Sequence, residues 1–447
     1  MFNTIKNALK TPDVRKRLLF TLLLIVVFRL GCYISVPGLN PDVLSLKNDS
    51  QGTGIAQLFN ILTGGAFSKL SIFSMTITPY ITASIVIQLL GMVIPSLEKL
   101  TKEGGEMERA KINRYTKILT LFLSLAEGIG LYFLGKNGQI IYGANVFINN
   151  GFLTAFLVVL SFMTGTAILM WLGEQITSKG IGNGISMLIF VGIVAGLGNS
   201  ARTLYSTVFG TTFDTKNLLL VLGVVLGALI LITAVVFVQQ AERRIPVQYS
   251  KKVVGRKMMG GQNTHIPLKL AMAGVMPIIF ASSFMTFPAM VIQLVNSNIA
   301  SQKGFWNVIY NISMATSSSD VSIQYTIINA IIYLLLIVGF TFFYTYATFN
   351  PAEISSNIKK NGGFIPGIRA GKSTTEYLSS VITKLTVFGG FFLALIAIIP
   401  MLFSHLPIGA NLAFGGTSIL IVVGVALETV QQLESQVVMK HYKGFLE

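Results

Sequence analysis

The chain has 447 residues and a net charge of +16, with 52% hydrophobic residues, 11% charged residues and a mean hydropathy of +0.70. So apolar a composition excludes a soluble globular protein of this length and indicates an integral membrane protein. The single cysteine, Cys32, excludes a disulfide within the chain.

Ten apolar stretches approach the length of about 20 residues that a membrane-spanning helix needs. In chain order they lie near residues 18–36, 70–97, 118–134, 152–172, 184–199, 217–241, 270–295, 321–349, 385–404 and 410–427. The first stretch follows basic residues, as in a signal peptide, but it continues through Arg29 without an evident cleavage site. We therefore interpret it as an uncleaved first helix.

Most Lys and Arg residues lie in alternate gaps between these stretches, mainly at residues 1–17, 98–117, 242–269 and 350–384. Loops that carry Lys and Arg near membrane helices stay on the cytoplasmic side. The pattern predicts a multi-pass protein with an even number of spans and both termini in the cytoplasm.

Two short motifs occur twice. Pro79-Tyr80-Ile81-Thr82-Ala83-Ser84 recurs as Pro277-Ile278-Ile279-Phe280-Ala281-Ser282, and Gly184-Ile185-Ser186-Met187-Leu188-Ile189 recurs as Gly416-Thr417-Ser418-Ile419-Leu420-Ile421. Matches in the second and seventh and in the fifth and tenth stretches favour two duplicated halves over chance. Since five is odd, the halves would be inverted, with the working centre between them. Pro79 and Pro277 are expected to kink or interrupt their helices.

Enzyme chemistry finds little support. His265, His405 and His441 lie in loops or the tail, without metal-ligand spacing. Ser186 and Ser418 stand in Gly-x-Ser patterns typical of intramembrane serine proteases, but no histidine lies well inside a span to act as the base. We expect no catalytic residue, no metal and no cofactor.

Two long loops are strongly basic. Their cationic residues are Arg243, Arg244, Lys251, Lys252, Arg256, Lys257, Lys269, Lys359, Lys360, Arg369 and Lys372. Such loops suit a large anionic partner such as RNA, whose phosphates they would neutralise. Anionic lipid headgroups are the alternative.

A few further features leave their interpretation open. Arg29, Glu127 and Glu428 are ionisable groups within or near the ends of spans, and each fits a functional charge or a snorkelling or paired structural charge. Residues 54–68 are apolar but too short to cross a bilayer. They fit either a re-entrant helix that fills a cavity or an amphipathic helix on the membrane surface.

The chain resembles the SecY family, the central subunit of the bacterial protein-conducting channel, over almost its whole length. The motifs that carry the resemblance are Pro79-Tyr-Ile-Thr-Ala-Ser84, Met170-Trp-Leu-Gly-Glu-Gln-Ile-Thr177, Gly180-Ile-Gly-Asn-Gly-Ile-Ser186, Met272-Ala-Gly-Val-Met-Pro277, Gly363-Phe-Ile-Pro-Gly-Ile-Arg369 and Phe414-Gly-Gly-Thr-Ser418. Ala370 is a departure, because many members have Pro there, which slightly loosens that turn.

The resemblance implies an all-α polytopic membrane protein with ten transmembrane helices in two inverted five-helix halves around a central hourglass pore. An aliphatic ring narrows this pore, and its residues are Ile77, Ile81, Ile185, Ile189, Ile279 and Ile421. The residues alone agree in part, because Ile77/Ile81 and Ile185/Ile189 are i, i+4 pairs on one helix face. An apolar constriction dewets and blocks ions while it offers a passing chain no polar site.

The resemblance also implies three other sites. Residues 54–68 would be a plug, with Ile55, Leu58, Phe59, Ile61, Leu62, Gly64 and Gly65 as its members. A lateral gate would carry the polar residues Thr82, Gln88, Glu127 and Ser283. The residues on which cytoplasmic partners would dock are Arg243, Arg244, Lys251, Lys252, Arg256, Lys257, Lys359, Lys360 and Arg369.

The implied function is the transfer of unfolded secretory polypeptides across the bacterial cytoplasmic (inner) membrane and the lateral release of membrane segments into lipid. Implied partners are SecE, SecG, the SecA motor, the ribosome through its RNA, signal sequences, nascent chains and membrane lipids. The expected organisation is an N-terminal segment (1–17), a first half (18–199), an external loop (200–216), a second half (217–432) and a tail (433–447). An inverted-repeat secondary transporter of a small solute is the alternative function.

Overall fold

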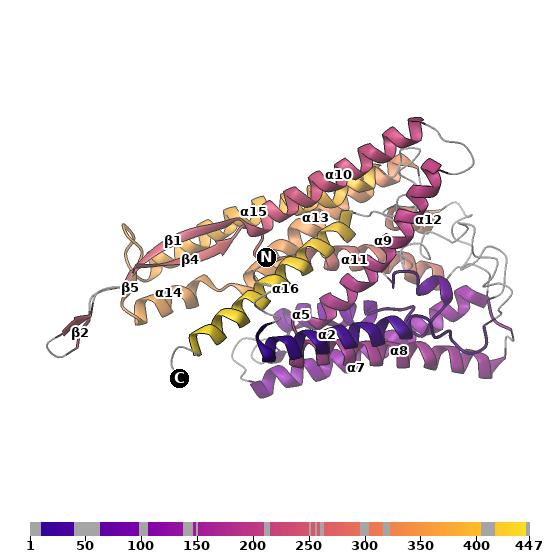
Figure 1. The fold of residues 1–447 in the computed structure, drawn as a ribbon, viewed down its shortest axis with the longest axis horizontal. Coiled ribbons are helices and arrows are strands. Elements are labelled where there is room, and N and C mark those ends of the chain that lie inside the picture. Colours follow the sequence, from indigo (N-terminus) through magenta and orange to yellow (C-terminus); the bar gives the residue numbers. More distant parts are fainter. Residues whose placement is uncertain are drawn as a thin grey trace.

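The computed structural model describes residues 10–39, 63–97, 106–136, 146–148, 151–209, 215–249, 252–254, 257–259, 263–295, 304–315, 322–403 and 416–443. This part of the chain is mostly helical (Figure 1). The long helices are α2 (Pro12–Gly31), α5 (Thr78–Val93), α7 (Glu106–Lys136), α8 (Phe152–Lys179), α9 (Gly184–Phe209), α10 (Thr215–Gln240), α11 (Met276–Val295), α13 (Ile323–Thr348), α15 (Lys372–Phe403) and α16 (Gly416–Lys443). Each predicted apolar stretch overlaps one of them. Shorter helices are η2 (Phe67–Lys69), α12 (Phe305–Met314) and α14 (Pro351–Lys360).

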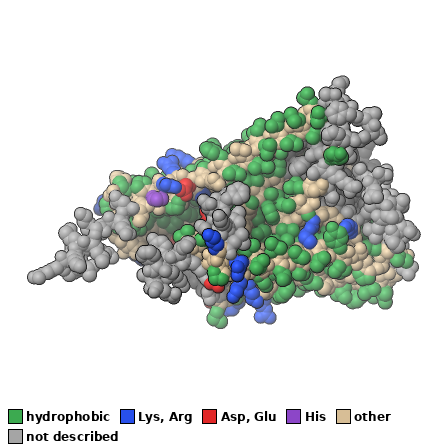
Figure 2. Space-filling model, in the orientation of Figure 1, with side chains coloured by type: hydrophobic (Ala, Val, Ile, Leu, Met, Phe, Trp, Pro, Cys, Tyr) green, Lys and Arg blue, Asp and Glu red, His purple; other side chains and the backbone are tan. Residues whose placement is uncertain are grey.

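Six helical segments of the described chain are long and apolar enough to cross a membrane. They are Ala110–Phe133, Phe152–Lys179, Val221–Gln240, Ile323–Lys360, Lys372–Ile399 and Ser418–Val438. Shorter apolar helices run over Thr78–Gly91, Gly184–Gly198 and Met276–Ala289. Hydrophobic side chains cover much of the helical surface, for example Ile230 on α10 with 68% of its surface exposed (Figure 2). Lipid is the surrounding that removes such surface from water, and the predicted mostly helical membrane architecture is confirmed.

The expectation of an all-α fold is wrong in the basic loops. Strand β1 (Glu242–Tyr249) pairs antiparallel with β4 (Asn263–Lys269) and with β5 (Gly363–Phe364), in the order β4-β1-β5. Strands β2 (Lys252–Val254) and β3 (Lys257–Met259) form a separate hairpin. Residues alternate along β1, with Ile245 and Val247 buried between exposed neighbours, which is the period of a half-buried strand.

Pro79 and Pro277 lie at helix starts rather than within helices. Pro79 and Pro277 are each the second residue of their helix, α5 and α11, and turns precede both. The first turn tolerates proline because its backbone N–H would lack a helical partner anyway. The long helix in the predicted span at 70–97 is therefore confined to Thr78–Val93, and a short helical turn follows at residues 95–97.

The repeated motifs occupy equivalent places in the structure. The Pro79 and Pro277 motifs begin at the second residue of α5 and α11, and Gly184 and Gly416 are the first residues of α9 and α16. This equivalence supports the duplication of the two halves.

Each half has a hydrophobic core of its own. In the first half, α2, α5, α8 and α9 contribute to one cluster, which includes Leu24, Ile77, Leu172 and Leu188. In the second half, α10, α11, α13, α15 and α16 share another, which includes Ile278, Tyr333, Leu393 and Leu420. Three further clusters contain residues of both halves, and one of them contains ring residues.

Helices extend across two of the expected boundaries. The connection expected at 200–216 is shorter, because α9 continues to Phe209 and α10 begins at Thr215. The tail expected from residue 433 begins as helix, since α16 continues to Lys443. Leu433 and Val437 hold this extension by packing with Val14 and Ile181 in a buried cluster.

Candidate functional site

Four of the six predicted ring isoleucines meet in one apolar cluster between the halves. Ile81 comes from α5, Ile189 from α9, Ile279 from α11 and Ile421 from α16. Ile279 and Ile421 are only 6% and 4% exposed. Two helices of each half therefore contribute to one aliphatic cluster, which takes the name constriction from the predicted ring.

The other two ring isoleucines pack beside this cluster rather than within it. Ile77 and Ile185 belong to the core of the first half, where Ile77 is buried and Ile185 is partly buried. Ile81 belongs to both clusters and connects them. The two i, i+4 pairs are thus divided between the clusters. Ile81 and Ile189 reach the constriction, while Ile77 and Ile185 pack α5 and α9 against the rest of the first half.

Three fully buried members of the constriction were not among the predicted ring residues. Ile193, Val275 and Val425 are buried in the same cluster. Each is four residues from a ring isoleucine: Ile193 follows Ile189, Val425 follows Ile421 and Val275 precedes Ile279. The i, i+4 spacing that relates Ile77 to Ile81 is the sequence signal that identifies them.

The start of α9 is held by close backbone packing. Gly184 donates its N–H to Thr177 Oγ1 at 2.9 Å, and a Cβ at this position would overlap the carbonyl oxygen of Gly173. Asn183 Oδ1 accepts the N–H groups of Ile185 and Ser186 at 3.1 and 3.4 Å. An N-cap of this kind satisfies donors that a helix start leaves free, and it fixes the direction in which Ile185 and Ile189 point.

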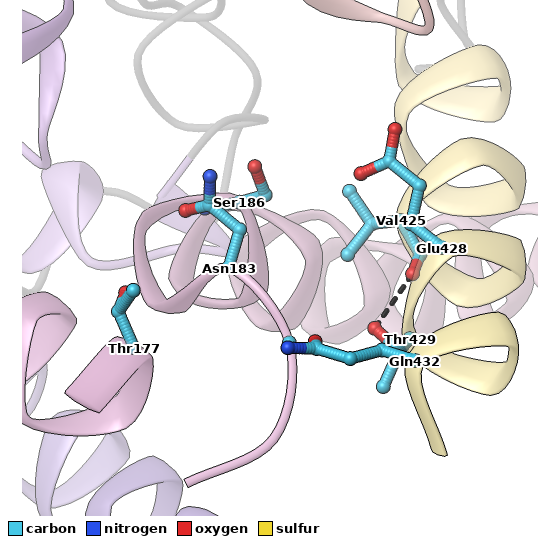
Figure 3. Close-up of a pocket in the computed structure, with 8 residues that line it drawn as sticks. Thr177, Asn183, Ser186, Val425, Glu428, Thr429 and Gln432 are labelled. Atoms are coloured by element: carbon cyan, nitrogen blue, oxygen red, sulfur yellow. Dashed lines mark hydrogen bonds between the residues drawn. The ribbon is translucent and has the colours of Figure 1, made fainter. Parts of the chain in front are cut away.

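A polar pocket of about 330 Å³ adjoins the constriction (Figure 3). Its lining residues are Thr177, Gly182, Asn183, Ser186, Val425, Glu428, Thr429 and Gln432. The start of α9 forms one wall and α16 the other, and Val425 belongs to both the pocket and the apolar cluster. Polar lining residues therefore give way to the apolar cluster within one turn of α16.

The plug assignment falls mostly outside the described residues. Ile55, Leu58, Phe59, Ile61 and Leu62 lie there. Gly64 and Gly65 are described, with φ angles of +60° and +91°. Glycine adopts this left-handed backbone without steric cost.

The predicted gate residues lie on helices that contact one another, because α11 packs against both α5 and α7. Thr82 and Gln88 bond within α5, to the Thr78 carbonyl at 3.1 Å and to Ser84 Oγ at 3.2 Å. Ser283 is half-buried on α11.

Among the predicted gate residues, Glu127 on α7 is the most deeply buried. Its side chain is buried, and its Oε2 has no hydrogen-bond partner among the described residues. A buried carboxylate oxygen without a donor is costly. A donor that approached α7 at this position would therefore be bound favourably.

The two basic loops form one body. Strand β5 of the second loop pairs with β1 of the first through Gln248↔Phe364 and Tyr249↔Gly363. A shared hydrophobic cluster of Ile245, Leu268, Ile358 and Leu378 lies beneath the sheet. In Figure 1 this body projects from the left end of the bundle, the end that α16 also reaches at its C-terminal residues.

The exposed surface of this body carries the predicted docking cations. Arg243, Arg244, Lys359, Lys360 and Arg369 are exposed, and Arg244 pairs with Glu242 at 2.7 Å. Figure 2 shows Lys and Arg side chains gathered around the strands and the adjacent helix ends. Lys252 and Lys257 lie on the β2–β3 hairpin, and Lys251 and Arg256 lie outside the described residues.

Comparisons with known proteins agree with one another. A family model of SecY matches residues 71–430. The protein translocase subunit SecY of Streptomyces scabiei is 42% identical over 455 residues, and that of Halalkalibacterium halodurans is 42% identical over 454 residues, with both chains covered completely in each case.

Solved structures show the same fold. One described as a protein-conducting channel matches with a TM-score of 0.63 at 22% identity, covering 93% of this chain and 91% of that chain. Sec61 in the canine ribosome–channel complex from the endoplasmic reticulum matches with a TM-score of 0.59 at 21% identity, with the same coverage.

Proposed function

The chain belongs to the SecY family of protein translocase subunits, a family of protein-conducting channels rather than enzymes, and we propose that unfolded polypeptides cross the membrane between its two halves. The constriction carries this proposal. Isoleucines from four helices, two in each half, meet in one apolar cluster next to a polar pocket. A path between the halves would pass through this cluster.

The six ring isoleucines would form the seal of the resting channel. The buried aliphatic side chains exclude water and therefore ions. They bind a passing chain only through weak, non-directional contacts, so polypeptides of any sequence slide through. Ile193, Val275 and Val425 extend the seal along the same faces of α9, α11 and α16.

The plug and the lateral gate complete the channel. Residues 54–68 would close the external side of the constriction, with Gly64 and Gly65 at the end of that segment. A signal sequence or membrane anchor would leave for the lipid between α5 and α7 on one side and α11 and α13 on the other. Thr82, Gln88, Glu127 and Ser283 would lie along this route, and Glu127 Oε2 offers an unused acceptor to an entering helix.

The basic body would bind the cytoplasmic partners. Arg243, Arg244, Lys359, Lys360 and Arg369 expose their charges on one connected structure, and Lys251, Lys252, Arg256 and Lys257 belong to the same loops. Ribosomal RNA and the SecA motor are the proposed partners there, while SecE and SecG would pack on the apolar faces within the membrane. The relative from the canine complex, described together with a ribosome, agrees with a ribosome-docking role.

The proposed topology has ten spans in two inverted halves with both termini in the cytoplasm. Placing the basic body in the cytoplasm satisfies the positive-inside rule, and α16 ends at the same end of the bundle. The proposed units are residues 1–17, 18–199, 200–216, 217–432 and 433–447. Because the matched relatives include SecY subunits of several bacteria, the proposed location is the bacterial cytoplasmic membrane.

Photo-crosslinking tests the path directly. A photo-reactive residue is placed at Ile81 or Ile279, and a secretory chain is stalled midway through translocation. Ile230 is the matched control, because it is an isoleucine exposed on the outer face of α10. We expect signal-dependent crosslinks from Ile81 and Ile279 and none from Ile230.

The opposite result would favour a different class of protein. A folded channel with its partners present that gives no crosslink at either ring position contradicts the proposed path. Uptake of a small solute driven by an ion gradient would then identify an inverted-repeat transporter.

A further inference from the structure

Arg29 is a cation in the last turn of α2 with an unusual acceptor. Its Nη1 donates to the backbone carbonyl oxygen of Thr63 at 3.4 Å and lies 3.9 Å from Cys32 Sγ. No carboxylate forms a salt bridge with Arg29 in the part of the chain that the structure describes. The charge is therefore matched mainly by a main-chain oxygen 34 positions along the chain.

The segment that receives this bond is a tight turn pressed between two helices. Thr63 is 1% exposed, and its Oγ1 accepts the N–H of Phe67 at 3.0 Å. Gly64 follows with a φ of +60°, and a Cβ there would overlap the carbonyl oxygen of Gly192 on α9 and lie 3.2 Å from Arg29 Nη1. At Gly64 the turn thus lies against both α9 and the Arg29 side chain.

This contact exists only while the turn is docked. Helix α2 does not need the Arg29–Thr63 hydrogen bond, because its own backbone bonds are complete without it. Arg29 is half-buried, so its guanidinium loses a charged hydrogen bond when the Thr63 carbonyl moves away, and charged hydrogen bonds are stronger than neutral ones. The bond therefore stabilises the docked position of the turn relative to any position in which the turn has moved away.

We propose that Arg29 is a positioning residue that holds the Thr63–Phe67 turn against α9 in the closed channel. The inference rests on the proposed function, in which Gly64 and Gly65 belong to the end of the plug segment. The bond to Thr63 must break when the channel opens, so Arg29 sets how readily the resting channel opens without a signal sequence. A purely structural or snorkelling arginine would not have this effect.

The first test is the ion conductance of the full channel, assembled with its partner subunits in a planar bilayer without substrate. Loss of a charged hydrogen bond predicts roughly a tenfold rise in resting conductance for Arg29→Met and Arg29→Gln. Arg29→Lys retains a charged donor and should restore part of the seal. Cys32→Ala is the matched control, because it removes the sulfur contact and leaves the bond to Thr63.

The second test uses Cys32 as a reporter, since it is the only cysteine of the chain and is 3% exposed. It lies in the same buried cluster as Ala66, which belongs to the turn, and Phe73, which follows it. Maleimide labelling of Cys32 in the assembled channel should accelerate roughly tenfold in Arg29→Met if the turn undocks more often. Leu30→Ala, at an exposed neighbouring position, should label at the unaltered rate.

The outcomes separate this inference from the proposed function. If serine at Ile81 or Ile279 makes the channel leak while the assembled Arg29→Met and Arg29→Gln channels stay sealed and label slowly, the role of Arg29 is overturned and the channel function stands. If crosslinking at Ile81 also fails, the fault lies with the proposed path. Should Arg29→Met not assemble, Arg29→Gln decides, and a sealed Arg29→Gln channel overturns the role of Arg29.

Discussion

The same residue type has different roles at neighbouring positions of this chain. Ile81 lies in the constriction, whereas Ile77, one helical turn earlier at the N-cap of α5, lies in the core of the first half. Ile185 likewise covers Gly173 on α8 while Ile189 faces the other half. Side chains one turn apart share a helix face, but the cluster that each joins depends on which neighbouring helix is closest.

Serine at the ring positions should open the seal. We expect Ile81→Ser or Ile279→Ser to raise the resting ion conductance of reconstituted channels by roughly tenfold or more, because a hydroxyl lets water wet an apolar constriction. Ile77→Ser should have a smaller effect, since Ile77 packs within the first half.

The exposed isoleucine of α10 again provides the control for this measurement. Ile230→Ser alters the lipid-facing surface and should leave the resting conductance unchanged. Equal conductance in the Ile81, Ile279 and Ile230 variants would contradict the seal assignment.

The positions of the helices in this fold depend on the residues at which they begin. Proline opens α5 and α11, and glycine opens α9 and α16. Glycine is required at position 184 for steric reasons, because the backbone of α8 occupies the place where a side chain would lie. These starts set the rotation of the helices, and the rotation decides which isoleucines face the constriction.

Alanine at Gly184 should destabilise the protein. Overlap with the Gly173 carbonyl forces a backbone shift that costs about 1–3 kcal/mol, which thermal unfolding of the purified protein would detect as a lower Tm. Gly198→Ala is the control on the same helix, because nothing lies within 4 Å of a Cβ there. It should leave the Tm unchanged or raise it slightly, since alanine favours helix; equal losses for both variants would show that space at Gly184 is not the cause.

Charge reversal in the basic body should affect docking rather than folding. Arg369 is exposed, and its described contact is made by its carbonyl oxygen, which accepts from Thr374 at 3.0 Å. We expect Arg369→Glu to reduce SecA-driven translocation by at least tenfold while the amount of assembled channel stays constant. Lys136→Glu, at the exposed end of α7, should leave both unchanged, and an equal loss of transport and assembly in Arg369→Glu would count against a docking role.

The whole molecule separates its functions in space. Apolar side chains cover the helical bundle, and Figure 2 shows Lys and Arg side chains both near the strands and at helix ends in the lower centre of this face. The two halves meet at the constriction and in two further buried clusters, one that includes residues of α11 and one at the C-terminal part of α16.

Ribosome binding by the assembled channel should depend steeply on salt. Neutralising a few phosphates releases condensed counterions, so the affinity should fall by roughly 10²-fold or more between 50 and 200 mM salt. Replacing Lys359 and Lys360 with Ala should make this dependence shallower, as measured by sedimentation with ribosomes. The Lys136→Ala control should keep the original slope, and an affinity independent of salt would exclude an RNA-dominated contact.

Much of the fold was predictable from local sequence features. Every predicted apolar stretch contains a helix, because helix length and hydropathy are properties of a continuous segment. The strands were missed although residues 242–249 alternate, with Ile245 and Val247 as the buried positions. The charge of that loop obscured its alternation.

The sequence by itself determined the membrane class, the helical segments, the family motifs and the aliphatic character of the ring. Each of these properties depends on a continuous stretch of residues. Only the tertiary structure decided that Ile77 and Ile185 turn toward the first half, that Ile193, Val275 and Val425 join the constriction and that β5 connects the two basic loops. The reason is physical: these outcomes depend on the rotation and distance of helices and strands that lie far apart in the chain, and packing alone sets both.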